Sequence, residues 1–464
     1  MKAPKLIDKW FDKYHNIHNY LYRYENGVRL VVSQNPATVE INIGAILEAG
    51  SYFERQLGVP QGTAHFLEHM MCKPSDLFKT REEMDAYTFG NRNRATVYSN
   101  ATTSRRFLYF YLDTNQTAQE RAINYLNHQL HYPLSRFSEF METERKIILA
   151  EWQRFPKLDQ NATLQAELFL LDGKYPEFSE AIIGTSESIS AIQIADLEKF
   201  YKEMFNADNL ILAVQMQHAP TPTLLMQLGK LAAGFVSAPP KVKDPEVLHN
   251  SFRYHVFHDP KEQGLYMSFN YFIPQRPEYD YKEQVLNYLV NNLINKVGND
   301  EYREKLGFVY DVGYIRSSLT WEWLVRGYKL TCNPEHTQEL LDLSLTFWEK
   351  GIEFLKTKQG ELWFIGQVSK YIFPLTTKFD DDYAEDIATG VLENKYRYIH
   401  TQAVKEAKKL KMSELIDFIQ TEIVDVPPHV WIESSLPEAE VEKMIKSSNL
   451  TKFWKAKSSK KSNA

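Results

Sequence analysis

The sequence contains few cysteines and no long apolar run. Cys72 and Cys332 are the only two cysteines in 464 residues, which excludes a disulfide framework and fits a reducing compartment. No stretch reaches the roughly 18 consecutive apolar residues of a membrane-spanning helix. Residues 1–20 lack the apolar core of a signal peptide, and their aspartates argue against a transit peptide. We therefore expect a soluble, cytoplasmic protein that has no membrane partner.

Positive charge is not in excess either. The chain has 54 Lys and Arg against 60 Asp and Glu, a net charge of -6, so it shows no electrostatic footprint for nucleic acid. The one basic run, "KFWKAKSSKKSNA" at the C-terminal end, is more typical of a frayed tail than of a binding arm. No nucleic-acid partner is expected.

The chain is long enough for two domains. With 43% apolar and 25% charged residues its composition is that of a globular protein, and 464 residues exceed what one core usually serves. The Pro-rich stretch "SAPPKVKDPEV" is typical of a linker. These observations predict a first domain at 1–236, a linker at 237–248, a second domain at 249–450 and a flexible tail at 451–464.

The two halves repeat the same order of elements. Alternating and continuous apolar runs predict strands, and a 3.6-residue apolar period predicts helices. The expected strands are 27–34, 40–50, 209–217, 254–260, 265–273 and 429–435, and the expected helices lie within 62–75, 141–155, 190–205, 281–297 and 412–423. The pattern predicts an α+β fold of two homologous α/β-sandwich-like domains, each an antiparallel-rich sheet packed with helices.

The stretch "GTAHFLEHMMCKPS" carries the chemistry that stands out most. On a helix, His65, Glu68 and His69 fall within an arc of about 100°, while apolar residues cover the rest of the surface. Such an arc could hold a metal and a general base. The alternative is a helix with two partly exposed histidines and no metal.

A third ligand decides between these interpretations, because catalytic zinc takes three protein ligands and keeps one position open. Glu144 and Glu151 are two helical turns apart and share a face with two isoleucines. A carboxylate buried there needs a metal or a hydrogen-bond donor. The alternative is a solvated face on which Arg145 and Lys146 pair with the acids. His15, His18, His128 and His131 show no ligand spacing with a third partner.

Five separated segments together resemble the M16 zinc metallopeptidases, the inverzincins with the motif H-x-x-E-H. They are "EAGSYFE" with "HFLEHM" and "NATTS", the Glu144–Glu151 segment, "IIGTSESI" and "YREKLGFVY", in the family's order over most of residues 20–435. The resemblance is to the short, two-domain, processing-peptidase-like members. It implies that the chain forms half of a clamshell.

The resemblance implies roles for the polar residues of the first half. His65, His69 and Glu151 would bind one Zn²⁺ per chain, although manganese or cobalt suits such ligands too. Glu68 would be the general base. Glu144 would orient the ligands and tune the metal without binding it directly. Cys72 is interpreted as a small, buried apolar residue rather than a ligand. The step from His69 to Glu151 is longer than usual for the family, and the extra residues within 73–99 could form a lid or a specificity loop.

Four further residues would hold the substrate. Asn100 and Ala101 lie on the strand that, in the family, pairs with the substrate backbone. Arg303 and Tyr310 match a pair that contacts the substrate carbonyl near the zinc. In short members this pair comes from a second chain, so we expect a homodimer that completes its sites in trans, or a heterodimer with a homologous M16-like chain.

The sequence thus predicts a zinc-dependent endopeptidase that hydrolyses short or unfolded peptides inside a dimeric chamber. General peptide turnover and removal of a leader segment both stay open. The alternative is a catalytically silent, peptide-binding or structural subunit of a two-chain M16 complex, against which the complete set of His65, Glu68, His69 and Glu151 argues.

Overall fold

The computed structural model divides the chain into two compact units. One comprises Met1–Lys157, Glu177–Lys243 and Thr376–Thr401, and the other the remaining segments. The structure describes residues 3–154, 166, 169–170, 181–238, 252–259, 264–274, 281–318, 323–377, 383–392, 400–424 and 426–461. Most of the predicted linker therefore lies outside the described residues. Within these ranges no helix is long and apolar enough to cross a membrane.

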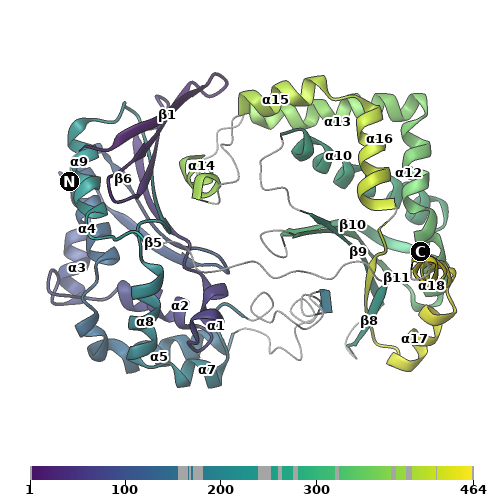
Figure 1. The fold of residues 1–464 in the computed structure, drawn as a ribbon, viewed down its shortest axis with the longest axis horizontal. Coiled ribbons are helices and arrows are strands. Elements are labelled where there is room, and N and C mark those ends of the chain that lie inside the picture. The colour runs from purple at the N-terminus through teal and green to yellow at the C-terminus, as the bar shows by residue number, and fades with distance from the viewer. Residues whose placement is uncertain are drawn as a thin grey trace. The chain divides into compact units, whose positions relative to one another are not determined.

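The first unit is built on a seven-stranded sheet in the order β1-β2-β3-β7-β4-β6-β5 (Figure 1). Strands β3 and β7 are parallel, and every other neighbouring pair is antiparallel. The strands are β1 (Lys5–Asp12), β2 (Ile17–Arg23), β3 (Arg29–Gln34), β4 (Glu40–Leu47), β5 (Tyr98–Thr103), β6 (Leu108–Asn115) and β7 (Leu210–Met216). Strand β5 forms one edge of this sheet.

Helices cover the two faces of this sheet unequally. Successive side chains of a strand point to opposite faces of the sheet, so every second apolar side chain of the central strands faces the helical layer. Helices α3, α4 and α9 lie on that side in Figure 1. The helices are α1 (Glu54–Leu57), α2 (Thr63–Met71), α3 (Arg81–Thr88), α4 (Gln119–Leu130), α5 (Phe137–Trp152), α7 (Ser186–Ala191), α8 (Ile194–Met204) and α9 (Pro222–Ala232). On the opposite face lies α14 (Tyr383–Leu392), which packs its apolar residues on Val31, Ile46 and Ile211.

The second unit has a five-stranded sheet in the order β10-β11-β9-β12-β8, with β12 and β8 parallel. Its strands are β8 (Arg253–His258), β9 (Leu265–Pro274), β10 (Val309–Ser318), β11 (Trp323–Cys332) and β12 (His429–Ser434). Its helices are α10 (Tyr281–Val297), the π-helical turn η6 (Gly298–Lys305), α11 (Thr337–Leu343), α12 (Phe347–Leu355), α13 (Lys358–Thr377), α15 (His400–Lys409), α16 (Met412–Ile419), α17 (Glu438–Ser447) and α18 (Asn449–Lys461).

The two sheets share one topology. The order β3-β7-β4-β6-β5 in the first unit matches β8-β12-β9-β11-β10 in the second strand for strand, including the single parallel pair. Helix α2 follows β4 in the first unit, and α10, which contains no histidine, follows β9 in the second. The predicted α+β fold of two homologous domains is confirmed.

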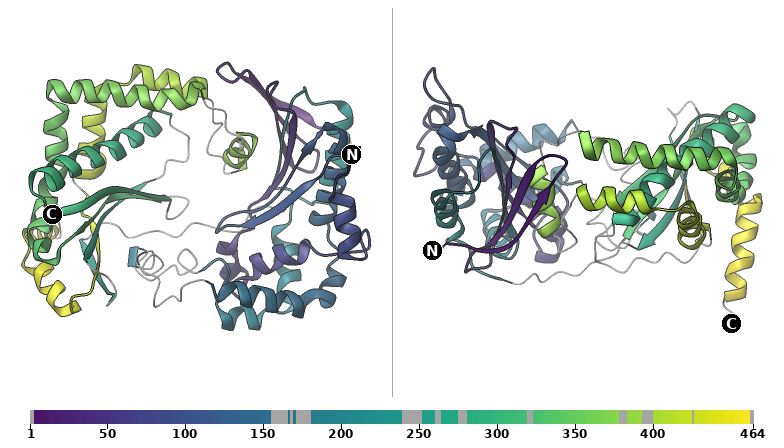
Figure 2. Two further views of the ribbon diagram at one scale, coloured as in Figure 1. Left: turned by 180° about the vertical axis from the view of Figure 1, so that it is seen from behind. Right: turned by 90° about the horizontal axis from the view of Figure 1, so that it is seen from above.

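Two parts of the chain differ from the predicted boundaries. The segment Thr376–Thr401, expected in the second domain, belongs to the first unit because α14 buries its apolar face on the first sheet. The tail, expected to be frayed, contains α18, the yellow helix at the C-terminal end of the chain in Figure 2. Leu450 and Trp454 of this helix are buried in the core of the second unit. Burying these two side chains stabilises the last helix despite its basic surface.

Candidate metal centre and substrate strand

Helix α2 begins at a tightly built turn. Its first residue follows Gly62, whose φ of +90° is a left-handed conformation that favours glycine. A side chain at this position would also meet the carbonyl oxygen of Ile183. The buried carboxylate of Glu54 accepts hydrogen bonds from the backbone N–H groups of Gly62 (2.9 Å) and Ala64 (2.7 Å). Glu54 thus accepts hydrogen bonds from backbone N–H groups that have no acceptor within the helix. Its negative charge also interacts favourably with the positive end of the helix dipole.

The faces of α2 divide as the sequence predicts. Phe66, Leu67, Met70 and Met71 are fully buried in the core. The remaining arc carries His65, Glu68 and His69, which are only partly buried, and the centroids of the two imidazole rings are 4.7 Å apart. The helix therefore presents three polar groups from a rigid element.

Helix α5 supplies the third member of the cluster. The Oε2 atom of Glu151 lies 3.9 Å from His65 Nε2 and 3.7 Å from His69 Nε2. One ligand atom from each of the three residues falls within 4.8 Å of the others. Ligand atoms that are each about 2 Å from a tetrahedral zinc ion are roughly 3.3 Å apart. These three residues therefore fit a zinc ion if their ligand atoms move slightly closer together. Burial, followed by the charge of His69, lowers the pKa of His65 to about 4, which keeps its imidazole neutral as a ligand must be.

Glu144 orients one of these histidines. Its Oε2 atom is 3.3 Å from His69 Nδ1, and Lys73 Nζ lies 2.6 Å from its Oε1. Burial alone would raise the pKa of Glu144, but the bonds from His69 and Lys73 outweigh it and lower that pKa. Because Nδ1 is held by Glu144, Nε2 is the atom left to face a metal. Within the described chain, Nδ1 of His65 is buried without such a partner.

The alternative solvated face of α5 is not what the structure shows. Arg145 donates to the carbonyl oxygens of Ile189 and Ile192 instead of pairing with the two acids. Ile147, expected beside the carboxylates in the interior, is 46% exposed, whereas Ile148 is buried. The sequence pattern did not predict the contact of Lys73 with Glu144, because Lys73 follows the end of α2, Glu144 lies on α5, and the two meet only through folding.

Glu68 is held by the neighbouring strand. Its Oε2 atom accepts a 2.5 Å hydrogen bond from the hydroxyl of Thr103, the last residue of β5. Burial raises the pKa of Glu68, an effect opposed by Thr103 and His69 and reinforced by the carboxylate of Glu151. Glu68 lies beside His65, His69 and Glu151, which together are called the metal-type cluster. A carboxylate with a raised pKa in this position can accept a proton and release it again.

Asn100 and Ala101 lie on β5, which among the described strands pairs with β6 alone and so forms an edge of the sheet. Asn100 is exposed, and its amide donates to the hydroxyl of Tyr111 at 2.8 Å. The N–H of Ala101 donates to Asn100 Oδ1 at 2.9 Å. The free side of an edge strand offers backbone groups to an added strand. The predicted substrate strand therefore adjoins Glu68 through Thr103.

Arg303 and Tyr310 belong to the second unit. Arg303 lies in η6 and Tyr310 in β10, with Gly307 between them at a φ of +68°, the helix-ending conformation that the sequence predicts. Tyr310 is 81% exposed, and Arg303 Nε lies 3.9 Å from Glu304 Oε1. Both side chains are thus available to a ligand.

Part of the segment 73–99 packs against α4, while residues 91–94 are exposed. Phe78 and Met84 are buried, and Ser75 Oγ lies 2.8 Å from His128 Nδ1 on α4. Helix α3, within this segment, packs on α4. The interpretations of this segment as a lid or as a specificity loop stay predictions. Cys72, beside the segment, stands outside the metal-type cluster, and burial raises its pKa to about 12.

A second polar cluster was missed by the sequence analysis. Asp12 Oδ2 is 3.0 Å from His15 Nδ1, 2.6 Å from His400 Nδ1 and 3.1 Å from the hydroxyl of Tyr383. Three donors on one carboxylate oxygen satisfy it without a metal. The cluster joins the turn after β1 to the segment Thr376–Thr401, which returns to the first unit between β11 and β12. Because 388 positions separate Asp12 and His400, local spacing gave no signal.

Comparison with known proteins agrees with the fold. Over 95% of the chain, the structure is similar to the first half of the periplasmic protease PqqL from Escherichia coli, with a TM-score of 0.74, 14% identity and 97% of that half covered. Pitrilysin is similar over 98% of this chain and 50% of its own, with a TM-score of 0.72 and 15% identity. At these identities the likeness defines the fold, which is the one seen in these proteases.

Family profiles then place the chain. The family described as "Insulinase (Peptidase family M16)" matches residues 29–168, and "Peptidase M16 inactive domain" matches residues 191–359. The chain belongs to the M16 peptidase family.

Two curated relatives illustrate the similarity. The beta subunit of a probable mitochondrial-processing peptidase from Arabidopsis thaliana is 28% identical over 190 residues, 40% of this chain and 34% of that protein. An uncharacterised zinc protease, YmxG, from Bacillus subtilis is 23% identical over 196 residues, 42% of this chain and 45% of that protein. The chain thus matches less than half of the length of either relative.

Proposed function

We propose that this chain is a zinc-dependent endopeptidase that cleaves short or unfolded peptides. The observation that carries the proposal is the convergence of His65, His69 and Glu151 around one point, with Glu68 beside them and an edge strand adjoining Glu68. The name of the Bacillus subtilis relative, a zinc protease, supports the choice of metal.

In this proposal His65, His69 and Glu151 hold the ion. When bound, zinc polarises the scissile carbonyl and lowers the pKa of a water molecule to about 7. Glu68 takes the proton of that water and passes it to the leaving amine. Thr103 holds the carboxylate of Glu68 in place, and Glu144 fixes the ring of His69. Each of these groups is on a helix or a strand, so none has to be ordered by the substrate.

The edge strand sets the class of substrate. A chain can add to β5 only if it is extended, which selects short or unfolded peptides and places little demand on their sequence. Asn100 and Ala101 lie where this pairing would occur. General peptide turnover and removal of a leader segment use the same geometry.

A second chain completes the site in this proposal. Arg303 and Tyr310 would stabilise the negative charge that forms on the substrate oxygen, a contribution of several kcal/mol when donors are well placed. We propose that they act on the cluster of another subunit, in a homodimer or with a homologous chain. Relatives named as the beta subunit of a processing peptidase support a partner chain.

Cleavage of a diverse peptide mixture, read by mass spectrometry, tests the activity. The wild-type protein loaded with zinc should cut, and Glu68→Gln should bind zinc equally but not cut. Absence of cleavage by zinc-loaded wild type would favour the alternative, a silent peptide-binding subunit, which the match to an inactive-domain profile keeps open. Mixing Glu68→Gln chains with Arg303→Ala chains should restore part of the activity. Verified mixed dimers without rescue would rule out the trans arrangement.

A further inference from the structure

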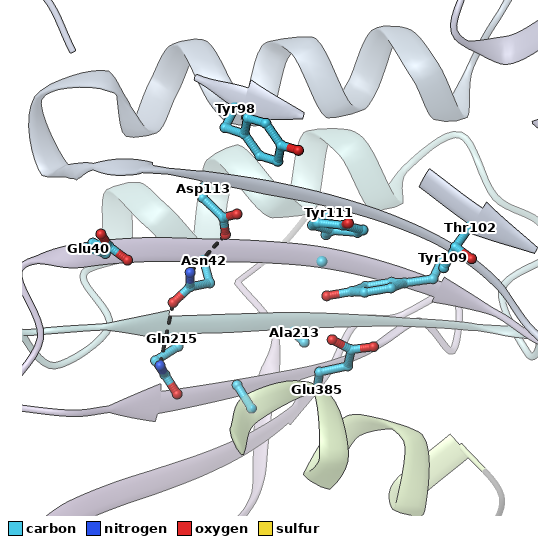
Figure 3. Close-up of a pocket in the computed structure, with 12 residues that line it drawn as sticks. Glu40, Asn42, Tyr98, Thr102, Tyr109, Tyr111, Asp113, Ala213, Gln215 and Glu385 are labelled. Atoms are coloured by element: carbon cyan, nitrogen blue, oxygen red, sulfur yellow. Dashed lines mark hydrogen bonds between the residues drawn. The ribbon is translucent and has the colours of Figure 1, made fainter. Parts of the chain in front are cut away.

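Two groups of polar side chains in the first unit lie on opposite faces of its sheet. One group lines a cavity of about 570 Å³ on the face away from the helical layer, where Asn42 donates to Asp113 and Gln215 donates to Asn42 (Figure 3). Tyr98 and Thr102 of β5 also line this cavity, so it adjoins the predicted substrate strand. The other group lies in the helical layer, where it connects α4 to the metal-type cluster.

Lys73, which follows the end of α2, reaches Glu144 on α5. Its Nζ atom lies 2.6 Å from Glu144 Oε1, and the other oxygen of this carboxylate is 3.3 Å from His69 Nδ1. The side chain of Glu144 is only 3% exposed, and that of Lys73 is 21% exposed. An ion pair between exposed side chains contributes little to stability, whereas a buried carboxylate depends on its partners. The contact of Lys73 with Glu144 is of the second kind.

The backbone around Lys73 is held on both sides. Its N–H donates to the carbonyl oxygen of Met70 in α2 at 3.3 Å, and its own carbonyl oxygen lies 3.3 Å from His128 Nε2 on α4. The hydroxyl of Tyr132 donates to the carbonyl oxygen of the next residue, Pro74, at 2.7 Å. Because the backbone is fixed, less conformational entropy is lost when the ammonium group of Lys73 pairs with a carboxylate.

The ring of His128 has a defined direction of hydrogen bonding. A carbonyl oxygen can only accept, so Nε2 carries the hydrogen and donates to Lys73. Burial lowers the pKa of His128, an effect that the bond to Lys73 opposes, and the ring is therefore neutral near pH 7. Nδ1 is then an acceptor, and the hydroxyl of Ser75, 2.8 Å away, donates to it. Ser75 Oγ in turn accepts from the N–H of Leu77 at 3.2 Å.

Packing fixes the plane of this ring. His128 and Ser75 are both buried, and the ring of Phe78 meets that of His128 edge to face, with centroids 5.0 Å apart and planes 83° apart. The ring of Tyr132 lies on another side, with its centroid 5.9 Å away. A buried histidine that has partners at both nitrogens and aromatic neighbours is a rigid support for the backbone that it binds.

Accepting the proposed zinc site, we propose that Lys73 and His128 are positioning residues of this site. His128 fixes the backbone of Lys73, and Lys73 holds Glu144 Oε1 so that Oε2 stays directed at His69. With the Nδ1–H group of His69 engaged in this way, the lone pair of Nε2 is kept for the metal. Neither Lys73 nor His128 belongs to the metal-type cluster itself.

Charge alone predicts the opposite effect of Lys73 on metal binding. A positive charge near a cation site repels the ion, so its removal would tighten binding. If Lys73 positions Glu144 instead, its removal takes the closest donor from a buried carboxylate, and His69 loses a fixed partner. Metal binding then weakens. The sign of the change in affinity therefore separates the two roles of this lysine.

Zinc affinity measures this sign. Lys73→Met removes the charge at a similar length and should raise the dissociation constant for zinc about fivefold, since Lys73 is one step further from the metal than partners that contribute tenfold or more. Lys73→Arg keeps the charge and should stay within about twofold of wild type. The matched control is Lys146→Met, an exposed lysine of α5, which should leave the constant unchanged. An unchanged or lower constant in Lys73→Met overturns the proposal for this residue.

Double variants show whether both residues act through Glu144. His128→Leu removes two hydrogen bonds and should raise the constant about threefold, because Lys73 is then present but less firmly held. In a Glu144→Gln background neither Lys73→Met nor His128→Leu should weaken zinc binding much further, since residues that act through one partner are not additive. Full additivity would overturn the proposed connection. Urea unfolding of each variant shows that the fold is retained under the conditions of the affinity measurement.

The tautomer of His69 gives a readout that needs neither metal nor activity. In metal-free protein labelled with ¹⁵N-histidine, long-range ¹H–¹⁵N correlation spectra show which ring nitrogen carries the hydrogen, and His69→Gln assigns the signals. Wild type and Lys73→Arg should carry it on Nδ1, whereas Lys73→Met should show a mixture of both forms, because Glu144 is no longer held. An unchanged tautomer in Lys73→Met contradicts the positioning role.

These outcomes separate the positioning role from the proposed activity. If wild type binds zinc but cleaves no peptide, the proposed peptidase activity fails, while the affinities still decide on Lys73 and His128. If wild type binds no zinc, the proposed metal site fails, and the tautomer of His69 decides on the contact of Lys73 with Glu144.

Discussion

The hydroxyl of Thr103 donates a 2.5 Å hydrogen bond to the carboxylate of Glu68, and this bond joins the edge strand to the helix of the histidines. One residue of β5 is therefore in contact with the proposed base, while its neighbours offer backbone to a substrate. The bond couples the position of a bound peptide to the position of the group that would act on it.

Removal of this bond should slow the reaction without removing the metal. Thr103→Val keeps the shape of the side chain and is expected to lower kcat about tenfold, because Glu68 loses its fixed orientation. Thr103→Ser, which keeps the hydroxyl, should stay within about twofold of wild type on the same grounds. Steady-state kinetics with zinc content measured in parallel provides the check. A KM effect with unchanged kcat would contradict a positioning role.

Loss of the charge on Glu144 should weaken metal binding. Glu144→Gln is expected to raise the dissociation constant for zinc about tenfold, because partners that orient a ligating histidine typically contribute this much. Competition with a chromogenic chelator measures the constant. Glu142→Gln, an exposed acid on the same helix, is the matched control and should leave it unchanged. Equal affinities in both variants would show that Glu144 does not act through His69.

Much of the fold could be predicted from local sequence patterns. The patterns of apolar residues placed β7, α8, α10 and β12 close to their observed bounds. This works because the spacing of apolar residues reflects both the type of element and the surface that it buries. Helix α14 could not be assigned to its unit in this way. Its partners on β3 and β7 lie far away in the sequence, and only the packed structure shows which sheet its apolar face covers.

The candidate site also has a part that local sequence predicts and a part that only the folded structure shows. His65, Glu68 and His69 share one helix, so their proximity follows from helical geometry alone. The contacts of Glu68 with Thr103 and of Glu144 with Lys73 depend on how separate elements meet, and no spacing in the sequence encodes them.

The two thiols should be inert in the folded protein. Burial raises the pKa of both Cys72 and Cys332 to about 12, so the reactive thiolate is scarce near neutral pH. Iodoacetamide at about pH 7.5 should leave both unmodified in the native state and alkylate both in denaturant, as the thiolate becomes accessible. Intact-mass spectrometry gives the readout. Rapid labelling of Cys72 in native protein would mean that the segment 73–99 opens readily.

The cluster of Asp12, His15, His400 and Tyr383 should stabilise the first unit in a pH-dependent way. Burial raises the pKa of Asp12, but the hydrogen bonds from His400 and His15 prevail and hold it well below its usual value of 3.8. A carboxyl whose pKa is depressed by folding contributes stability that is present above the unfolded value and is lost as the pH falls below it. Asp12→Asn should therefore cost about 2 kcal/mol of unfolding free energy near pH 7, the scale of hydrogen bonds to a buried charge.

The difference between wild type and Asp12→Asn should be constant above about pH 5 and shrink as the pH falls below about 4, because the unfolded carboxyl then takes up a proton more readily than the folded one. Urea unfolding at a series of pH values from neutral to acid measures it. Asp8→Asn, on the same strand but outside the cluster, controls for general effects of charge. If the difference in unfolding free energy persisted unchanged at acid pH, Asp12 would contribute by packing alone. The contact between the turn after β1 and the segment Thr376–Thr401 would then not depend on the charge of Asp12.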